Sequence, residues 1–259
     1  MLRPRIIPCL LLHNGGLVKT IRFSDPKYVG DPLNTVRIFN EKEVDELIVA
    51  DIDATVLNRE PNYALIAHLA AESRMPLCYS GGIRVPEQVE RIVGLGVEKV
   101  AVGTAACTST NIVAEAARRV GSQSVVVVLD AKRVGPSNRY ELFTHRGQRS
   151  TGLEAAEFAR SVESAGAGEI LVNSIDQDGV MEGYDLTLID LVRSVVQLPI
   201  TVMGGAGSID DIAAVIRRYG IIGAAAGSVF VFKGRFRAVL LQYPSRVERD
   251  ALCAITRGL

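Results

Sequence analysis

The sequence has no tryptophan, and aromatic residues make up only 5% of its 259 residues. It also lacks an excess of charge, because 29 basic residues balance 29 acidic residues. Proteins that bind nucleic acid usually have a basic surface or aromatic side chains that stack on bases. An excess of positive charge is likewise typical of proteins that bind an anionic membrane surface. We therefore expect neither nucleic acid nor a membrane as a partner.

Long hydrophobic runs and paired cysteines are also missing. The N-terminal apolar run is about six residues long and contains Pro8, whereas a membrane helix needs about 20 residues. No small-residue cleavage site follows this run, as a signal peptide would require. Neither the cysteines nor the histidines have the spacing of a metal site; they are Cys9, Cys78, Cys107, Cys253, His13, His68 and His145. We expect a cytoplasmic protein with reduced thiols and with no metal or cofactor.

Short apolar runs recur along the chain, with longer stretches of helical periodicity between them. The eight runs are 5–11, 46–51, 76–80, 98–103, 124–130, 169–174, 199–204 and 221–227. Most of them show no alternation of polar and apolar residues, which is typical of strands buried on both faces. Eight strand–helix units in about 250 residues predict an α/β fold, the closed (β/α)8 or TIM barrel. An open, doubly wound sheet is the alternative.

Internal repeats favour the closed barrel, because an open sheet has no reason for such symmetry. The repeated pairs are 5–15 with 124–134, 44–54 with 167–177, 79–84 with 202–207, and 101–106 with 225–230. No linker rich in Pro, Gly or Ser divides the chain. We interpret residues 1–259 as one domain made of two similar half-barrels, each with four strand–helix units.

Glycine-rich turns follow corresponding strands of the two halves. Residues 81–84 and 103–104 follow the third and fourth predicted strands, and residues 204–207 and 227–228 follow the seventh and eighth. Glycine lets the backbone approach a phosphate, and the next helix supplies its N-terminal amides. The alternative is that the turns need glycine only for steric reasons. The symmetric pairs favour two phosphate sites, one in each half.

Acidic residues gather at the strand ends that form the catalytic face of such barrels. They are Asp51, Asp53, Asp130, Asp176 and Asp178. We interpret Asp53 and Asp176 as caps or loop contacts. Asp130 ends an apolar run, and burial there would suit a general acid or base. The repeat aligns Asp130 with Leu11, which cannot transfer a proton.

Four charged residues begin apolar runs at the opposite end of the predicted barrel, which we call the floor. They are Arg5, Glu46, Lys99 and Glu169. Arg5 and Leu11 are an even number of residues apart, so a regular strand would turn both towards the interior. The two positive and two negative charges can therefore form a ring at the floor. A purely structural cluster of ion pairs is the alternative, since this face of a barrel usually serves stability.

The motifs of the whole chain, taken in order, resemble the cyclase (HisF-type) subunit of imidazole glycerol phosphate synthase, a family of histidine biosynthesis. The resemblance covers essentially all 259 residues. It rests on motifs such as RIIPCL at 5–10, DELIVADIDA at 45–54, EKVAVGTAA at 98–106, SVVVVLDAKRV at 124–134 and SIDQDG at 174–179. The fold that the family implies is the duplicated (β/α)8 barrel predicted above.

The resemblance also implies a mechanism and a partner. In the family, a glutaminase subunit docks on the floor as a heterodimer and releases ammonia, which passes a four-charge gate and rises through the barrel. At the other end, ammonia attacks a substrate with a phosphate at each end, assisted by two aspartates. The gate positions correspond to Arg5, Glu46, Lys99 and Glu169. The phosphate-binding positions correspond to Gly82, Thr104, Gly179, Gly205, Gly227 and Ser228. Further positions on the catalytic face are Lys19, Asp51, Asp130 and Asp178, of which Asp130 and Asp178 are the predicted catalytic residues.

The departures from the family concentrate at the catalytic face. Leu11 replaces the aspartate that ends the first strand, and His13 replaces the usual lysine two positions later. Asn173 and Met203 stand where the family has small hydroxyl residues, and Gly103 replaces an asparagine. The loss of one general acid or base should slow the family reaction about 10²–10⁴-fold.

Three functions fit this combination of a complete floor and an altered catalytic face. The first is a divergent paralogue that accepts ammonia from a glutaminase for the amidation of a sugar. It would be similar to the glycosyl-amidation proteins of bacterial surface-polysaccharide and lipopolysaccharide biosynthesis. The second is a genuine histidine-pathway cyclase and lyase with rearranged catalysis. The third is a non-catalytic protein that activates a glutaminase. Leu11 favours the first function, with a phosphorylated small molecule or sugar as the substrate.

Overall fold

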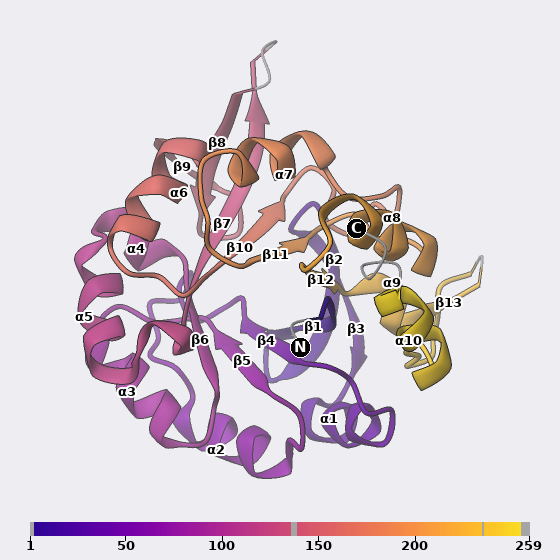
Figure 1. The fold of residues 1–259 in the computed structure, drawn as a ribbon. Helices are drawn as coiled ribbons and strands as arrows, with labels where there is room; N and C mark the ends of the chain where they lie inside the picture. The colour runs from indigo at the N-terminus through magenta and orange to yellow at the C-terminus, as the bar shows by residue number, and fades with distance from the viewer. Residues whose placement is uncertain (1–2, 136–138, 235, 255–259) are drawn as a thin grey trace.

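The computed structural model describes residues 3–135, 139–234 and 236–254, and within them parallel strands close into a barrel (Figure 1). The eight barrel strands are β1 (Arg5–His13), β4 (Leu47–Asp51), β5 (Leu77–Ser80), β6 (Lys99–Val102), β7 (Val125–Val134), β10 (Glu169–Ser174), β11 (Ile200–Met203) and β12 (Gly223–Ala226). Strand β12 pairs with β1, and β7 pairs with β10, so the ring of strands is complete. The predicted (β/α)8 barrel is confirmed, and the open sheet is wrong. The predicted domain limits, residues 1 and 259, lie outside the described residues.

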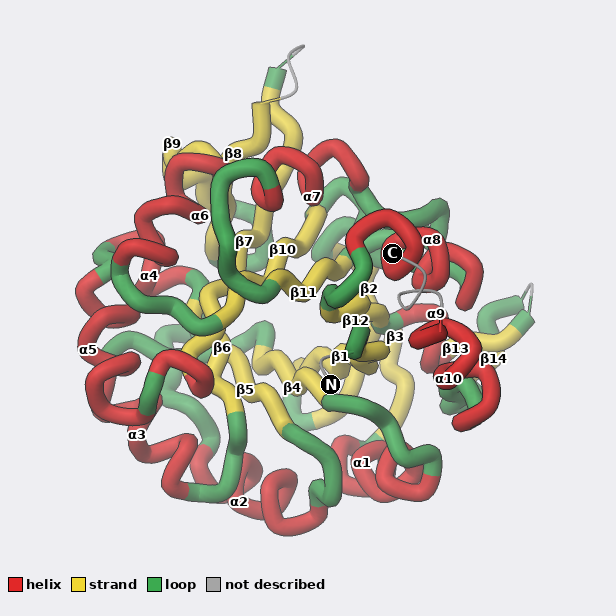
Figure 2. Tube along the Cα trace, in the orientation of Figure 1, coloured by secondary structure: helices red, strands yellow, loops and turns green. Residues whose placement is uncertain are grey.

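Helices surround the barrel and cover the outer faces of its strands (Figure 2). In the described part of the chain they are α1 (Pro32–Glu41), α2 (Tyr63–Glu72), α3 (Pro86–Gly94), α4 (Thr104–Thr108), α5 (Asn111–Val120), α6 (Ala155–Ser164), α7 (Leu186–Arg193), α8 (Ile209–Tyr219), α9 (Ser228–Val231) and α10 (Arg246–Ala254). Local signals set several starts: Asp31 caps α1, and the Ser208 hydroxyl accepts from the Asp211 amide at the start of α8. No helix among the described residues is long and apolar enough to span a membrane.

Each half-barrel carries an antiparallel extension after its first strand. Strands β2 (Gly16–Ile21) and β3 (Ser24–Gly30) extend β1, and strands β8 (Arg139–Thr144) and β9 (Arg149–Glu154) extend β7. Two short strands, β13 (Phe232–Lys233) and β14 (Ala238–Val239), form a separate hairpin. None of these strands forms a continuous apolar run, so the sequence did not predict them; β3, for instance, buries only Val29.

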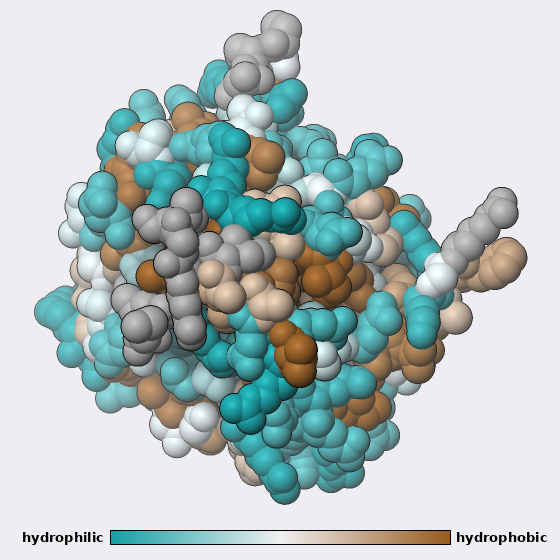
Figure 3. All heavy atoms as spheres, turned by 45° about the vertical axis from the view of Figure 1, so that its right-hand side comes forward, coloured by the Kyte–Doolittle hydropathy of each residue, from teal (hydrophilic) through white to brown (hydrophobic). Residues whose placement is uncertain are grey.

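The hydrophobic core has two parts, one between strands and helices and one inside the barrel. The inner cluster is Ile7, Cys9, Ile48, Cys78, Ala101, Val126, Leu171 and Ala225, with Leu11, Val128 and Met203 packed against it. Most of the outer surface in Figure 3 is hydrophilic, as expected of side chains that face water. Inside the barrel, the inner cluster lies between two ends. One is the floor, and we call the opposite end the mouth.

Candidate functional site

A cavity at the mouth brings together residues from both half-barrels. Its lining includes the predicted catalytic and phosphate-binding residues and their neighbours on the catalytic face: Leu11, Lys19, Asp51, Gly82, Thr104, Asp130, Asp178, Gly179, Gly205, Gly227 and Ser228. Parallel barrel strands end on one face, so residues distant in sequence meet there. The cavity reaches down to Cys9, Ile48 and Leu171 of the inner cluster, so its polar rim lies above an apolar base.

Asp130 and Asn173 form a polar pair at the ends of neighbouring strands. The β7–β10 register places the two residues opposite each other, and Asn173 Nδ2 donates to Asp130 Oδ1 at 2.8 Å. Burial raises the pKa of Asp130 to about 6. A carboxyl group with this pKa can give or take a proton near neutral pH. Asn173 is buried, and its Oδ1 has no hydrogen-bond partner within the described residues. This oxygen is therefore an unpaired acceptor beside the carboxyl group of Asp130.

Lys19 and Asp178 line the part of the cavity next to the second half-barrel. Lys19 reaches there from β2 of the first half, whereas Asp178 belongs to the second half. Burial lowers the pKa of Lys19, whose Nζ donates to the backbone oxygen of Cys9. A Cβ at Gly227 would collide with this ammonium group, so the lysine lies directly along the glycine turn after β12. Asp178 accepts a hydrogen bond from Thr20 Oγ1 at 2.7 Å, and burial raises its pKa. A buried amine beside a glycine turn is suited to balancing the charge of a bound anion.

Leu11 and Asp51 line the first-half side and offer less acid–base chemistry. Leu11 is partly buried and packs against the inner cluster. Asp51 Oδ1 accepts from the amides of Asp53 and Ala54 at 2.9 and 3.0 Å, although burial raises the pKa of Asp51. Its contacts are those of a residue that stabilises the turn after β4. The carboxylate at Asp130 thus faces an alkyl side chain at the corresponding strand end of the other half.

The conformation of the glycine turns and the backbone packed against them require glycine. Gly82 and Gly205 have φ values of +73° and +111°, which disfavour other residues. A Cβ on Gly205 would lie 1.9 Å from the backbone oxygen of Gly183, so no larger residue fits there. Thr104 and Ser228 begin the helices that follow the other turn of each half. Phosphate binding at these turns remains a prediction.

A cluster around Arg146 crosses the mouth, and sequence reasoning did not find it. Arg146, in the turn between β8 and β9, forms an ion pair with Asp53 of the other half and donates to the backbone oxygen of Ile52 at 3.0 Å. His13 Nδ1 lies 2.8 Å from the same Asp53 carboxylate. Nothing in the local pattern around Arg146 signals a contact so distant in sequence. The long connection after the fifth predicted strand was the one available hint, because long barrel loops are often functional.

The structure also shows what the remaining acidic residues and hairpins do. Asp53 accepts from the Asn14 amide at 2.7 Å, and Asp176 accepts from the Arg133 amide at 2.9 Å, so the interpretation of both as loop contacts is confirmed. Phe23, from the β2–β3 turn, lines the cavity and lies beside Gly147 of the β8–β9 turn. The two hairpins thus meet over the cavity.

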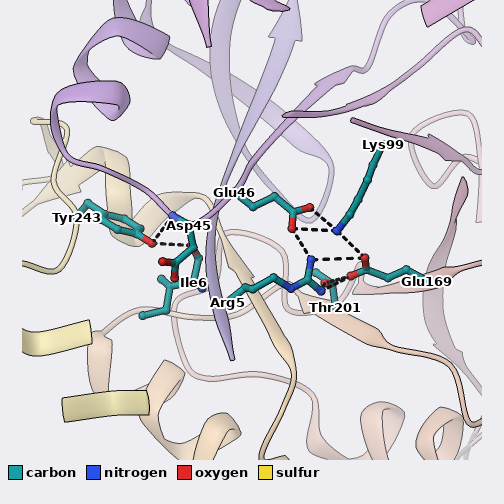
Figure 4. Close-up of polar contacts among 8 residues, drawn as sticks. All are labelled: Arg5, Ile6, Asp45, Glu46, Lys99, Glu169, Thr201 and Tyr243. Atoms are coloured by element: carbon teal, nitrogen blue, oxygen red, sulfur yellow. Dashed lines mark hydrogen bonds and ion pairs between the residues drawn. The ribbon is translucent and has the colours of Figure 1, made fainter. Parts of the chain in front are cut away.

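The four charged residues at the floor meet in one ring (Figure 4). Lys99 Nζ lies 3.0 Å from Glu46 Oε2 and 2.9 Å from Glu169 Oε2. Arg5 Nη2 donates to Glu169 Oε1 at 2.6 Å, and Arg5 Nη1 pairs with Glu46. Each cation therefore contacts both anions. We refer to Arg5, Glu46, Lys99 and Glu169 as the charged ring.

The electrostatics of the charged ring keep Arg5, Lys99 and Glu169 ionised. Burial opposes charge on Lys99 and Arg5, but the two glutamates outweigh it and raise the pKa of both cations. Burial acts to raise the pKa of Glu169, but Arg5 and Lys99 lower it further than burial raises it. Both glutamates are buried, so an unpaired charge at this place would be unfavourable. The ring is therefore closed by mutual neutralisation.

Comparison of the sequence with known proteins identifies the family of this chain. The model of the histidine biosynthesis protein family matches residues 5–237. This chain belongs to that family. A protein of Leptospira borgpetersenii named "Putative imidazole glycerol phosphate synthase subunit HisF" is 53% identical over 252 residues, which span 97% of this chain and 99% of the relative.

Two further HisF relatives are almost as similar. A Vibrio vulnificus protein with the same description and the symbol hisF3 is 51% identical over 249 residues, or 96% of each chain. The Pseudomonas aeruginosa protein hisF2 is 51% identical over 250 residues, which cover 96% of this chain and 99% of the relative. The HisF-type resemblance of the sequence is confirmed. No group of three or more potential metal ligands occurs in the part of the chain that the structure describes.

Proposed function

We propose that this HisF-type barrel accepts ammonia from a glutaminase partner and delivers it for the amidation of a sugar in surface-polysaccharide biosynthesis. One contrast carries the proposal. The charged ring at the floor is complete, whereas Leu11 occupies a strand end that faces Asp130 across the mouth. A barrel that retains ammonia delivery and loses one of two carboxylates is suited to a different acceptor.

At the floor, the glutaminase docks around the charged ring and the barrel interior forms the conduit. Glutamine hydrolysis in the partner gives glutamate and ammonia. Ammonia is small and neutral, so it can cross the apolar inner cluster, whereas ions are disfavoured there. Along β1, Arg5 belongs to the ring, Ile7 and Cys9 to the inner cluster, and Leu11 to the cavity. This order is the sequence of surfaces that ammonia would meet.

At the mouth, the two glycine turns would hold a phosphorylated small molecule or sugar. Gly82 and Thr104 bind one end, while Gly205, Gly227 and Ser228 bind the other with Lys19 as the counter-charge. Asp130 has a pKa of about 6, so it can exchange a proton with ammonia that reaches the mouth. Asn173 holds that carboxylate and presents its free carbonyl oxygen to an N–H group of the ligand. The sugar-amidating step itself would belong to a further enzyme.

The names of two relatives are consistent with a divergent paralogue. The symbols hisF2 and hisF3 carry numerals, which fits a protein that is one of several HisF-type copies. A paralogue is free to change its acceptor while the other copy makes histidine. Work in the cytoplasm, beside a glutaminase and the sugar-amidating enzyme, is part of the same proposal.

A second function, the histidine-pathway cyclase and lyase reaction, has one specific observation in its favour. Both phosphate loops, Lys19 and Asp130 line a single cavity, as that reaction requires. The two functions are separated by an assay of the purified barrel with the glutaminase encoded beside its gene. The proposal expects glutamine-dependent sugar amidation once the amidating enzyme is added. Glutamine-dependent formation of imidazole glycerol phosphate at the rate of a two-carboxylate relative would overturn it.

A further inference from the structure

Among the contacts of the charged ring, that of Arg5 with Glu46 joins the starts of two neighbouring strands, β1 and β4. The other contacts reach across one or two intervening strands. Between β1 and β4, the register begins only at Cys9 and Ile48. The contact of Arg5 with Glu46 lies below that point. The strand starts that carry these two residues therefore need another connection.

Side chains make that connection (Figure 4). The Tyr243 hydroxyl donates to the backbone oxygen of Ile6 at 2.7 Å and accepts from the Asp45 amide at 3.1 Å. The Ile6 amide in turn donates to Asp45 Oδ2 at 3.0 Å. Ile6 directly follows Arg5, and Asp45 directly precedes Glu46. One phenol hydroxyl thus bridges the two chain segments that carry Arg5 and Glu46.

Tyr243 is itself held from both sides. Its ring centroid lies 5.4 Å from that of Phe230 and 5.2 Å from the guanidinium carbon of Arg249. Arg249, from α10, donates to the backbone oxygens of Lys42 and Pro244 at 3.2 and 3.3 Å. Burial raises the pKa of Tyr243, so its hydroxyl keeps the proton that it donates to Ile6. The C-terminal segment therefore presents this hydroxyl in a fixed position.

We propose that Tyr243 is a positioning residue for the charged ring: its hydroxyl sets the separation of the starts of β1 and β4, so that Arg5 and Glu46 meet. The link from this positioning to ammonia transfer rests on the proposed function. The positioning itself does not, because it concerns only contacts within this chain. It makes the C-terminal segment, at the floor of the barrel, part of the machinery that closes the ring.

The test measures how fast Lys99 is reductively methylated in the isolated full chain, with formaldehyde as the probe, cyanoborohydride as the reductant and mass spectrometry as the readout. Lys99 reacts slowly while the glutamates keep it ionised and partly buried. Tyr243→Phe keeps the ring contacts and removes only the hydroxyl. Tyr243→Phe loses both hydrogen bonds of the hydroxyl, which should open the ring at least about fivefold more often and speed Lys99 methylation by the same factor. Lys19, at the mouth, should react at its wild-type rate.

Tyr219→Phe is the matched control, because it removes a tyrosine hydroxyl that bonds to Asp190 on the outer surface. It should leave Lys99 methylation unchanged. Asp45→Asn, which weakens the hydrogen bond to the Ile6 amide, is the second variant and tests the proposal if Tyr243→Phe does not fold. It should also speed Lys99 methylation. Wild-type methylation of Lys99 in the folded variant, or equal acceleration of Lys19, would overturn the proposal.

The same variants separate this inference from the proposed function. With the glutaminase added, Tyr243→Phe should lower the fraction of glutamine nitrogen that reaches product. If Lys99 responds but wild-type protein transfers no ammonia, the positioning stands and the ammonia function fails. If ammonia transfer occurs but Lys99 does not respond, the positioning fails alone.

Discussion

The floor and the mouth of this barrel differ in how completely their polar groups are paired. At the floor, each charge of the charged ring contacts both charges of opposite sign. At the mouth, Asp130 has a raised pKa, Asn173 has an unpartnered oxygen, and the facing strand end carries Leu11. Fully paired charges suit a closed gate, whereas polar groups without a partner suit a site that binds a ligand. This contrast is the basis of the proposal that ammonia delivery is retained while the acceptor differs.

The largest expected effect comes from breaking the charged ring. Lys99→Ala leaves both buried glutamates with one cation, and removal of one partner from a buried ion pair lowers stability by about 3–5 kcal/mol. Urea unfolding would measure this change. Arg218→Ala, which breaks the exposed Arg218–Asp190 pair, is the matched control and should lower stability by less than about 1 kcal/mol. Similar losses in the two variants would contradict a buried, coupled ring.

The pH dependence of stability sharpens the description of the mouth. The folded pKa of Asp130, about 6, lies above the ordinary value of 3.8, so its contribution to stability is present below pH 3.8 and is lost as the pH rises through 6. Between pH 4 and 7, the free energy of unfolding of the wild-type protein should therefore fall by up to about 3 kcal/mol relative to that of Asp130→Asn. Unfolding curves at several pH values measure the difference.

Asp190→Asn is the control for that measurement. Its hydrogen bond to Arg218 lowers the pKa of Asp190, so this carboxylate contributes stability above its unfolded pKa and loses it as the pH falls. The slope of its difference curve should have the opposite sign. A flat curve for Asp130→Asn would mean that Asp130 is an ordinary solvated carboxylate.

Restoring the missing carboxylate tests the mouth directly. Leu11→Asp should raise turnover of the histidine-pathway substrate with free ammonia by about 10²-fold, the lower end of a general acid–base contribution. Leu11→Asn has nearly the same shape but transfers no proton, so it should bring no such gain. Wild-type turnover equal to that of a two-carboxylate relative would show that Leu11 is no obstacle.

Much of this comparison could be predicted from the sequence, and what could not has a physical reason. Strands β7 and β10 are buried on both faces, so their apolar runs predict them and place Asp130 and Glu169 at opposite ends. Strand β3 buries only Val29 and leaves no such run. The contacts of Arg146 with Asp53 and of Tyr243 with Ile6 join segments far apart in the chain. Their local patterns therefore carry no trace of the partner.

The smallest expected effect concerns the phosphate turns. Inorganic phosphate should raise the melting temperature, because binding to the folded state alone adds stability. Ser228→Ala and Thr104→Ala each remove one hydroxyl, so each should reduce this stabilisation by about 1 kcal/mol or less. Ser194→Ala, at the end of α7 and away from the cavity, is the control. An unchanged melting temperature in abundant phosphate would argue against both sites.

The transfer of nitrogen through the barrel tests the central claim most directly. The complex of this chain, its glutaminase and the amidating enzyme receives glutamine with a ¹⁵N side-chain amide, together with excess unlabelled ammonium. If the barrel conducts ammonia, the amidated sugar made by wild-type protein should carry mostly ¹⁵N, and Lys99→Ala should dilute it. Product that carries the isotope ratio of the bulk solution in wild-type protein would contradict the account.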